Sequence, residues 1–426
     1  MEDSKECRLF SEYRLLYTST EEIPNTLKFM IQLKDKINLS SLSFALNQVK
    51  LRYPYFCVEL KKDQKGYYFI KNDRDIKLEN NNIKIGLNTL SSNLHFISFQ
   101  YSDDNYIIIN LAHCLTDGKG AYELIKTLLY YYITNAYKVE LSKENIRLID
   151  DEIKEEEIND PLLNIKNIIK PERIETPVCL NVIKENLLEN QNKVLYHLSI
   201  DEKELMDYVK TIKATPNTLM ALLLAKAIKK ENVNSDKIIR MNICFDLRKL
   251  LNTPLAHQCL VGAILFDYDE KLINLSLEEQ IKVVREKVKE SLEEPQSLNS
   301  ISSAYNLLLM LSNLKDEDKI KQISGIINNK TKETVSASIS YVGKANFGDI
   351  EQFITDFKTI TISHTPIMIE ISAVNGRFYL DFIQNFEDER YIKAFKEELE
   401  SLKIKYEVKD VCKIELPGFN RHSLDE

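Results

Sequence analysis

His113 is the residue of this 426-residue sequence whose type and setting best suit proton-transfer chemistry. The run Tyr106–Leu111 is almost entirely apolar and predicts a buried strand that delivers Ala112 and His113 to its carboxyl end. An imidazole titrates near neutral pH, so it can accept a proton there from a hydroxyl, an amine or a thiol. The local residues also allow a second interpretation, in which His113 is an ordinary structural histidine.

Two more residues with a chemical role follow His113 closely. Asp117 and Gly118 open a predicted helix over Gly118–Tyr137, and Gly120 falls in its first turn. Aspartate is a preferred N-cap, and a carboxylate near a buried strand end needs a cationic partner. Glycines at this point permit the close approach of another molecule. We therefore expect the helix amides, the histidine and a ligand to meet at one place.

The cysteines offer no comparable site. The seven are scattered and odd in number, none forms a C-x-x-C pair, and none joins a histidine at zinc-like spacing. We expect reduced, mostly buried thiols and no metal site. Cys114 adjoins His113, but neighbouring strand residues face opposite sides, so it is predicted to pack away from the histidine.

Composition excludes several classes of function. The net charge is −8 and no basic run with interleaved aromatics occurs, which argues against a nucleic-acid partner. No apolar run reaches the roughly 18–20 residues that span a bilayer, so an integral membrane protein is not expected. The first residues lack the pattern of a signal peptide, and we expect a cytoplasmic protein.

Strand and helix patterns alternate through two halves of the chain, which predicts an α/β class with mixed sheets. The first lobe is predicted over residues 1–180, ending in a crossover linker from about 138 to 192, and the second over 193–426. The acidic run Asp150–Glu157 reads as a solvated face of the linker. Other expected elements are strands at Asn82–Leu87 and Thr359–Ser372 and helices at Leu219–Lys230 and Glu387–Leu402.

The spacing His113-x-x-x-Asp117-Gly118 resembles the HxxxDG motif of the chloramphenicol-acetyltransferase-like superfamily, which includes condensation domains, plant BAHD acyltransferases and alcohol acetyltransferases. Further segments resemble superfamily elements in the expected order. They are Phe10–Leu15, Leu51–Phe56, Phe245–Lys249 and Ser340–Gly348. Together they look most like the bacterial alcohol-acetyltransferase-like branch, and they favour the catalytic interpretation of His113.

The sequence also departs from relatives. Condensation domains usually carry a second histidine where this chain has Ala112, which favours a stand-alone transferase. The D-F-G-W-G motif of the plant enzymes is missing. The segment Ala256–Cys259 stands where relatives often show an Asn-rich turn, so family roles cannot be carried over to it.

The resemblance implies two lobes forming a pseudo-dimer, with a tunnel between them and His113 as the general base inside it. It implies transfer of an acyl group from acyl-CoA to the hydroxyl or amine of a small-molecule acceptor, without a covalent acyl-enzyme. Acyl-CoA would be a co-substrate, and no permanently bound cofactor is expected. Because two lobes of one chain make the pseudo-dimer, we expect a monomer.

The same resemblance assigns roles to individual residues. Asp117 would orient the histidine loop through an arginine, and Gly118 would leave room for the acceptor. The candidate arginines are Arg14, Arg52 and Arg248, and the candidates for an oxyanion or acyl site are Ser340, Tyr341 and Asn346. Two alternatives stay open. The donor could be an acyl carrier protein, as for condensation domains, or the chain could be a non-catalytic relative that binds a ligand in the same groove.

Overall fold

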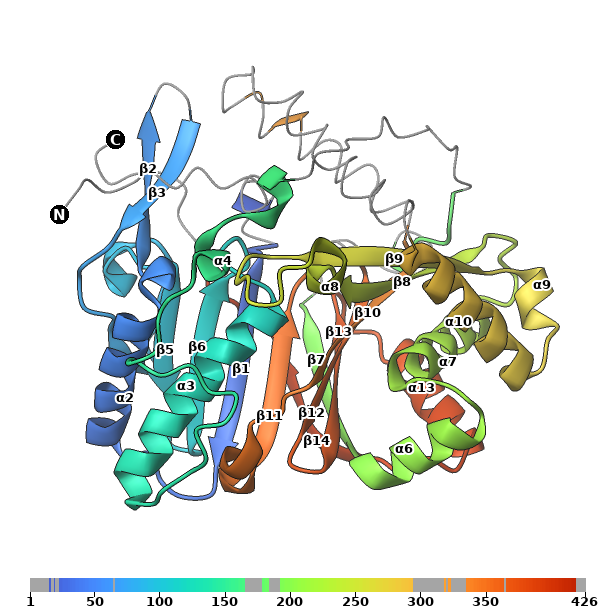
Figure 1. Ribbon diagram of the computed structural model, residues 1–426. Helices are drawn as coiled ribbons and strands as arrows, with labels where there is room; N and C mark the ends of the chain where they lie inside the picture. Colours follow the sequence, from blue (N-terminus) through green and yellow to red (C-terminus); the bar gives the residue numbers. More distant parts are fainter. Residues whose placement is uncertain are drawn as a thin grey trace.

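The computed structural model describes residues 15–16, 19, 23–63, 66–164, 178–183, 192–293, 318, 321–322, 335–363 and 365–418. Their elements form two large sheets that stand side by side, each with its own helices, and a separate two-stranded sheet, β2-β3 (Figure 1). The strands are β1 Thr26–Leu33, β2 Val58–Asp63, β3 Gly66–Lys71, β4 Leu78–Asn80, β5 Ile97–Tyr101, β6 Tyr106–Ala112, β7 Val194–Asp201, β8 Ile239–Asp246, β9 Val261–Tyr268, β10 Ala337–Lys344, β11 Ile354–Thr361, β12 Ile367–Val374, β13 Arg377–Gln384 and β14 Glu407–Lys413. The α-helices are α2 Leu39–Arg52, α3 Gly118–Tyr137, α4 Glu155–Ile158, α6 Glu202–Thr211, α7 Pro216–Glu231, α8 Arg248–Leu251, α9 Glu270–Ile273, α10 Leu277–Leu292 and α13 Arg390–Ser401.

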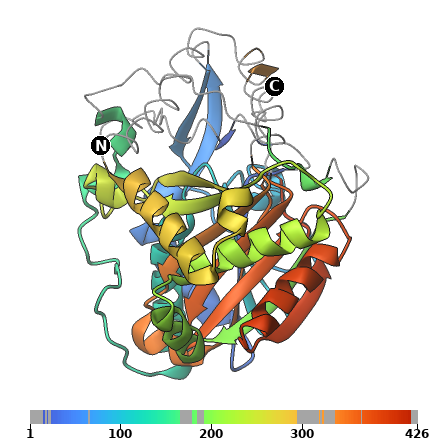
Figure 2. The ribbon, with the colours of Figure 1, turned by 90° about the vertical axis from the view of Figure 1, so that its right-hand side faces the viewer.

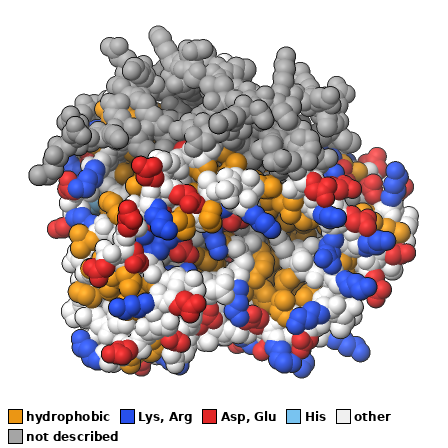
Figure 3. Space-filling model, in the orientation of Figure 1, with side chains coloured by type: hydrophobic (Ala, Val, Ile, Leu, Met, Phe, Trp, Pro, Cys, Tyr) orange, Lys and Arg blue, Asp and Glu red, His pale blue; other side chains and the backbone are white. Residues whose placement is uncertain are grey.

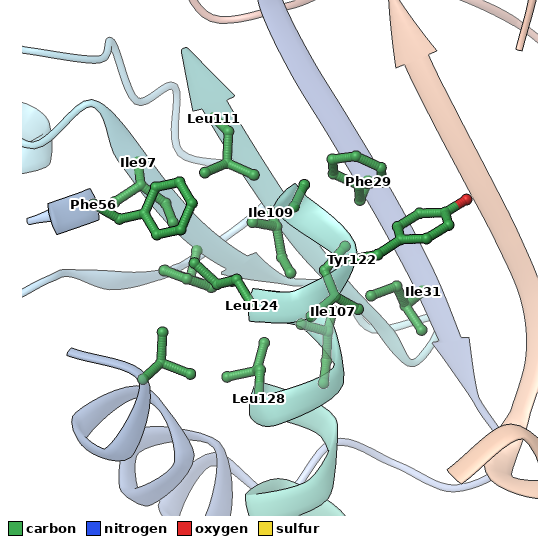
Figure 4. Packing of buried hydrophobic residues seen from close by; sticks show 14 of the residues in the cluster. Phe29, Ile31, Phe56, Ile97, Ile107, Ile109, Leu111, Tyr122, Leu124 and Leu128 are labelled. Carbon is green, nitrogen blue, oxygen red and sulfur yellow. The ribbon is translucent and has the colours of Figure 1, made fainter. Parts of the chain in front are cut away.

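The first sheet has the order β11-β1-β6-β5-β4 and is covered on one face by α2 and α3. Strand β6 lies at its centre, paired antiparallel with both β1 and β5. Apolar residues at every second position of these strands meet the buried side of α3 (Figure 4). The labelled residues are Phe29, Ile31, Phe56, Ile97, Ile107, Ile109, Leu111, Tyr122, Leu124 and Leu128. This packing fixes the carboxyl end of β6, where the histidine follows.

The second sheet has the order β14-β7-β13-β12-β10-β8-β9, and α7, α10 and α13 pack on its outer face (Figure 2). Strand β10 runs parallel to both β8 and β12, whereas β12 and β13 form an antiparallel hairpin. The hairpin turns at Asn375 and Gly376, which both have positive φ and so suit a type I′ turn. The α/β class with mixed sheets in two lobes is therefore confirmed.

A strand from the second half of the chain completes the first sheet. Strand β11 pairs antiparallel with β1, while β12, which follows it directly, belongs to the second sheet. The predicted single strand Thr359–Ser372 is thus wrong, because the chain passes from one sheet to the other between Thr361 and Ile367. The predicted strand Asn82–Leu87 is also wrong; the strand β4 lies earlier, at Leu78–Asn80.

A buried group of charged side chains joins the two sheets. His197 on β7 bonds through Nδ1 to Asp381 on β13, at 2.7 Å, and through Nε2 to Asp356 on β11, at 2.9 Å. Tyr106 donates its hydroxyl to the other oxygen of Asp356 at 2.7 Å. The imidazole and both carboxylates are almost fully buried. One bridging side chain therefore touches a strand of each sheet.

The surface carries charges of both signs. In Figure 3, lysine and arginine side chains alternate with aspartate and glutamate over the described part of one face, with small apolar areas between them. Within the described residues, no helix combines the length and the apolar character that crossing a membrane requires.

Candidate active site

A cavity of about 460 Å³ lies between the two sheets. Its walls come from β1 and β11 of the first sheet, from β8, β10 and β12 of the second, and from the start of α3. His113, Asp117 and Gly118 line it, together with Ser340 and Tyr341. Two segments that are far apart in the sequence thus meet at one ligand-sized space, as sites between packed units commonly do.

The backbone and the ring of His113 are both held in place. The residue follows β6 directly, and its backbone N–H donates to the carbonyl of Asn25 at 2.7 Å. The ring Nδ1 lies 2.8 Å from the carbonyl oxygen of Thr116. Because a carbonyl can only accept, Nδ1 carries the hydrogen in the neutral ring, and the lone pair is on Nε2. The half-buried imidazole is therefore arranged as a base.

The protonation of His113 is coupled to a neighbouring thiol. Burial lowers the pKa of His113, but Cys259 and then Asp117 act against it, and the balance raises that pKa to about 9. His113 is therefore deprotonated, and able to accept a proton, toward the alkaline side of neutral pH.

Asp117 is fully occupied by hydrogen bonds. Its Oδ1 accepts from the backbone N–H of Gly120 at 3.0 Å and from Arg248 at 2.9 Å, and Oδ2 accepts from Arg248 and from the Leu260 N–H, each at 2.9 Å. Burial raises the pKa of Asp117, but Arg248 outweighs this, and the pKa lies below its ordinary value. A carboxylate with four donors has no oxygen left for proton transfer, which suits an orienting role.

Arg248 uses its remaining donors on the loop that follows β8. Its Nε donates to the carbonyl of Ala256 at 2.8 Å, and its terminal nitrogens reach Asp246 and the carbonyl of Gln258, both at 2.9 Å. Nearby, the Thr116 hydroxyl donates to the carbonyl of His257 at 2.7 Å. The segment Ala256–Cys259 is therefore bound tightly to the loop that carries His113.

Of the three arginines considered as partners of Asp117, the structure brings Arg248 to it. Arg52 instead donates two bonds, of 3.0 and 2.9 Å, to Glu157, which also accepts from Tyr55 and Arg147. Glu157 is buried, which corrects the expectation that the whole acidic run is solvated: two arginines and a tyrosine compensate its charge there. Arg14 lies outside the described residues.

The two glycines at the start of α3 are packed against other parts of the chain. A Cβ on Gly118 would come within 2.5 Å of the Val342 side chain, which also lines the cavity. A Cβ on Gly120 would overlap the Thr116 hydroxyl and the His257 carbonyl. Gly120 therefore allows the close contact between α3 and the loop after β8. The HxxxDG pattern alone does not predict this requirement.

The candidate oxyanion residues lie in different places. Ser340 and Tyr341 line the cavity, and the Ser340 hydroxyl interacts with the carboxyl of Glu370 on β12. Asn346 is exposed, has a φ of 51°, and is not among the residues that line the cavity. Its position corrects the sequence prediction, because the chain leaves the sheet at Lys344 and turns outward before Asn346.

Sequence reasoning missed Cys259 and Glu370. Nothing in the sequence brings Cys259 close to a histidine 146 positions earlier (259 − 113), since that approach depends on how the lobes pack. Glu370 did have a local sign, as a single acidic residue within the otherwise apolar run of β12. By contrast, Cys114 is fully buried in the core under α3 and does not line the cavity, which agrees with the prediction that it packs away from His113.

Similar structures exist, although no family model and no curated protein matches this sequence. One is TRI101 from F. graminearum complexed with coenzyme A and deoxynivalenol, with a TM-score of 0.63, 12% identity, and coverage of 94% of this chain and 99% of that one. Polyketide synthase associated protein 5 from Mycobacterium tuberculosis has a TM-score of 0.59 and 14% identity, with coverage of 94% of this chain and 98% of that one. The condensation domain of the polyketide synthase MokA has a TM-score of 0.59 and 11% identity, with coverage of 93% of this chain and 96% of that one. Full-length agreement at such low identity establishes the shared two-lobed fold.

Proposed function

We propose that this chain is an acyltransferase that moves an acyl group from an acyl-CoA thioester to a hydroxyl or amine acceptor, with His113 as the general base. The observation that carries the proposal is the ring of His113, which is fixed through Nδ1 by the Thr116 carbonyl and lines the cavity between the sheets. Structural neighbours that bind coenzyme A with a small acceptor, such as TRI101, support the same reaction class.

The proposed reaction has two stages. Nε2 of His113 takes the proton of the acceptor while its oxygen or nitrogen attacks the thioester carbonyl, giving a tetrahedral oxyanion. The intermediate collapses, the carbon–sulfur bond breaks, and the thiolate of coenzyme A takes the proton back from the imidazolium. No covalent acyl-enzyme forms. A positioned base contributes about 10²–10⁴-fold in rate, and the orientation of two substrates in one cavity supplies much of the rest.

Asp117 and Arg248 act in this proposal as positioning residues. Their bidentate ion pair joins the start of α3 to the loop after β8. Thr116 lies between His113 and Asp117, and its carbonyl orients the ring of His113. Tyr341 is the remaining sequence-predicted candidate near the developing oxyanion, since Ser340 interacts with Glu370.

The donor is a separate part of the proposal. Structural neighbours include condensation domains as well as the complexes with coenzyme A, and both donor types present a thioester. We propose acyl-CoA as the donor, because Ala112 replaces the first histidine of the condensation motif. An acyl carrier protein is the alternative.

A panel assay tests this assignment. The purified chain is incubated with acyl-CoAs of graded length and with matched acyl carrier proteins, each with a set of alcohols and amines, and release of free thiol is followed. We expect acceptor-dependent thiol release from acyl-CoA. Release from carrier proteins alone would transfer the assignment to the condensation type, and release from neither donor would refute acyl transfer.

A further inference from the structure

Glu370 is a buried carboxyl group that the proposed reaction does not use. It lies in the middle of β12, is 5% exposed, and lines the same cavity as His113. On this strand Ile369 and Ile371 pack into the core under α7, so the alternate residue Glu370 faces the other way, toward the cavity. The strand therefore places one acidic group in an otherwise uncharged part of the wall.

None of the described ion pairs compensates the charge of this carboxyl group. Of the basic side chains that line the cavity, Arg248 is paired with Asp117 and Asp246, and Lys119 is exposed at the start of α3. His113 also lines the cavity and attracts the ionised carboxyl group when its ring is protonated. The neighbour of Glu370 on β13 is Asp381, which has the same charge and is itself bound to His197. The Ser340 hydroxyl and the charge of His113 both favour the ionised form of Glu370, but burial outweighs them and raises the pKa of Glu370 to about 7.

A second acceptor in the same wall lies on β8. The side-chain oxygen of Asn242 on β8 is buried and has no hydrogen-bond partner among the described residues, while its nitrogen donates to Ser338 at 3.3 Å. Asn242 and Ser338 both line the cavity. Burying an acceptor that has no donor costs free energy, and burying a carboxylate with one neutral donor costs free energy as well. A ligand that brings donors and a positive charge would remove it.

We propose that Glu370 and Asn242 form a subsite for a protonated amine that the acyl acceptor carries in addition to the group that is acylated. This inference rests on the proposed acyl transfer and specifies its acceptor class: an amino alcohol or a diamine rather than an apolar alcohol. The ammonium group lies against the β8–β10–β12 wall, and the free hydroxyl or amine points to His113. The two ends of the acceptor are thus recognised by different lobes.

The test uses pairs of alcohols that differ in the charge alone. One member is a dimethylamino alcohol, whose tertiary nitrogen is protonated at neutral pH and forms no stable amide. The other is the alcohol in which a CH group replaces that nitrogen. Several chain lengths are compared. Binding to the full chain is measured by isothermal titration calorimetry, and kcat/KM is measured from thiol release with acetyl-CoA.

We expect the wild-type protein to bind the charged member roughly 10- to 100-fold more tightly, as charge-assisted hydrogen bonds in a buried site do. Glu370→Gln keeps the shape of the side chain and should abolish this ratio. Glu290→Gln, at an exposed position of α10, is the matched control and should leave it unchanged.

Three results would overturn the inference. The first is that the wild-type protein binds both members equally or binds neither. The second is that the ratio of the two binding constants is unchanged in Glu370→Gln. The third is that kcat/KM falls equally for both members in that variant, which would mean that Glu370 acts on His113 instead. Failure of acyl transfer is distinguishable from these. In that case the calorimetric preference persists in the wild-type protein while no acyl-CoA releases thiol.

Discussion

At the scale of single residues, His113 gains its properties from contacts that lie outside its motif. The Thr116 carbonyl fixes its tautomer, and Cys259, from the second lobe, influences its charge. The sequence predicts His113 and Asp117 from local pattern and family resemblance. It cannot predict which arginine meets Asp117, because Arg52 and Arg248 are equally plausible until the loop after β8 is placed in space.

Removing the thiol should change the pH dependence of the reaction. Cys259→Ala removes the largest contribution that raises the pKa of His113, so burial should bring that pKa below its value of about 9. Since the base must be deprotonated, the acid limb of kcat/KM should shift to lower pH. A pH–rate profile measures this. An acid limb at the same pH in both proteins would contradict the coupling.

Breaking the buried ion pair should cost both stability and activity. Asp117→Asn leaves the Arg248 guanidinium buried without its main counter-charge, which costs about 3–5 kcal/mol of unfolding free energy. Urea denaturation measures the loss, and thiol release measures activity. Asp388→Asn, at a partly exposed pair with Arg390, is the control and should cost less than about 1 kcal/mol. An Asp117→Asn protein of full stability but without activity would indicate direct chemistry at Asp117.

At the scale of elements, the strongest sequence patterns predicted helices and central strands well. The expected helix over Leu219–Lys230 corresponds to α7, which begins at Pro216 with Thr215 as its N-cap, and the expected Glu387–Leu402 helix corresponds to α13. The errors fall on short edge segments such as Asn82–Leu87. Pairing partners decide such strands, and local propensity does not contain that information.

The start of α3 offers a test at this scale. Gly→Ala in a helix normally stabilises it by about 0.5–1 kcal/mol, but Gly120→Ala should destabilise the protein, because the new methyl group overlaps Thr116 and the His257 carbonyl. Lys119→Ala, one position earlier and exposed, is the control for helix propensity. Thermal unfolding of both variants decides the sign. A Gly120→Ala protein as stable as the control would show that the loop after β8 moves away from α3 at little cost in free energy.

At the scale of the whole molecule, the site exists because the lobes meet. The sequence predicts a mixed α/β fold of two lobes, and the fold confirms this class. It does not predict that β11 crosses to the first sheet, because antiparallel pairing with β1 joins residues more than 300 positions apart (354 − 33 = 321 at the nearest pair). The same crossing brings Asp356 to His197 and creates the buried bridge between the sheets.

This bridge should make stability depend on pH. Burial lowers the pKa of His197, but Asp381 and Asp356 outweigh it and raise that pKa from 6.5 to about 9. A raised pKa means that the stabilisation is fully present below about 6.5 and is lost as the pH rises through about 9. Urea unfolding between pH 6 and 10 should show a decline of a few kcal/mol in the wild-type protein. His197→Gln should lack most of this decline, and equal slopes in both proteins would contradict the assignment.

The central claim is that His113 removes the acceptor proton in the cavity between the lobes. The most direct measurement is thiol release from the best acyl-CoA and acceptor pair, comparing His113→Ala with the wild-type protein at matched folded fraction. We expect a loss of about 10²–10⁴-fold in kcat with an unchanged thermal midpoint. Transfer by a folded His113→Ala protein at a rate near that of the wild type would contradict it.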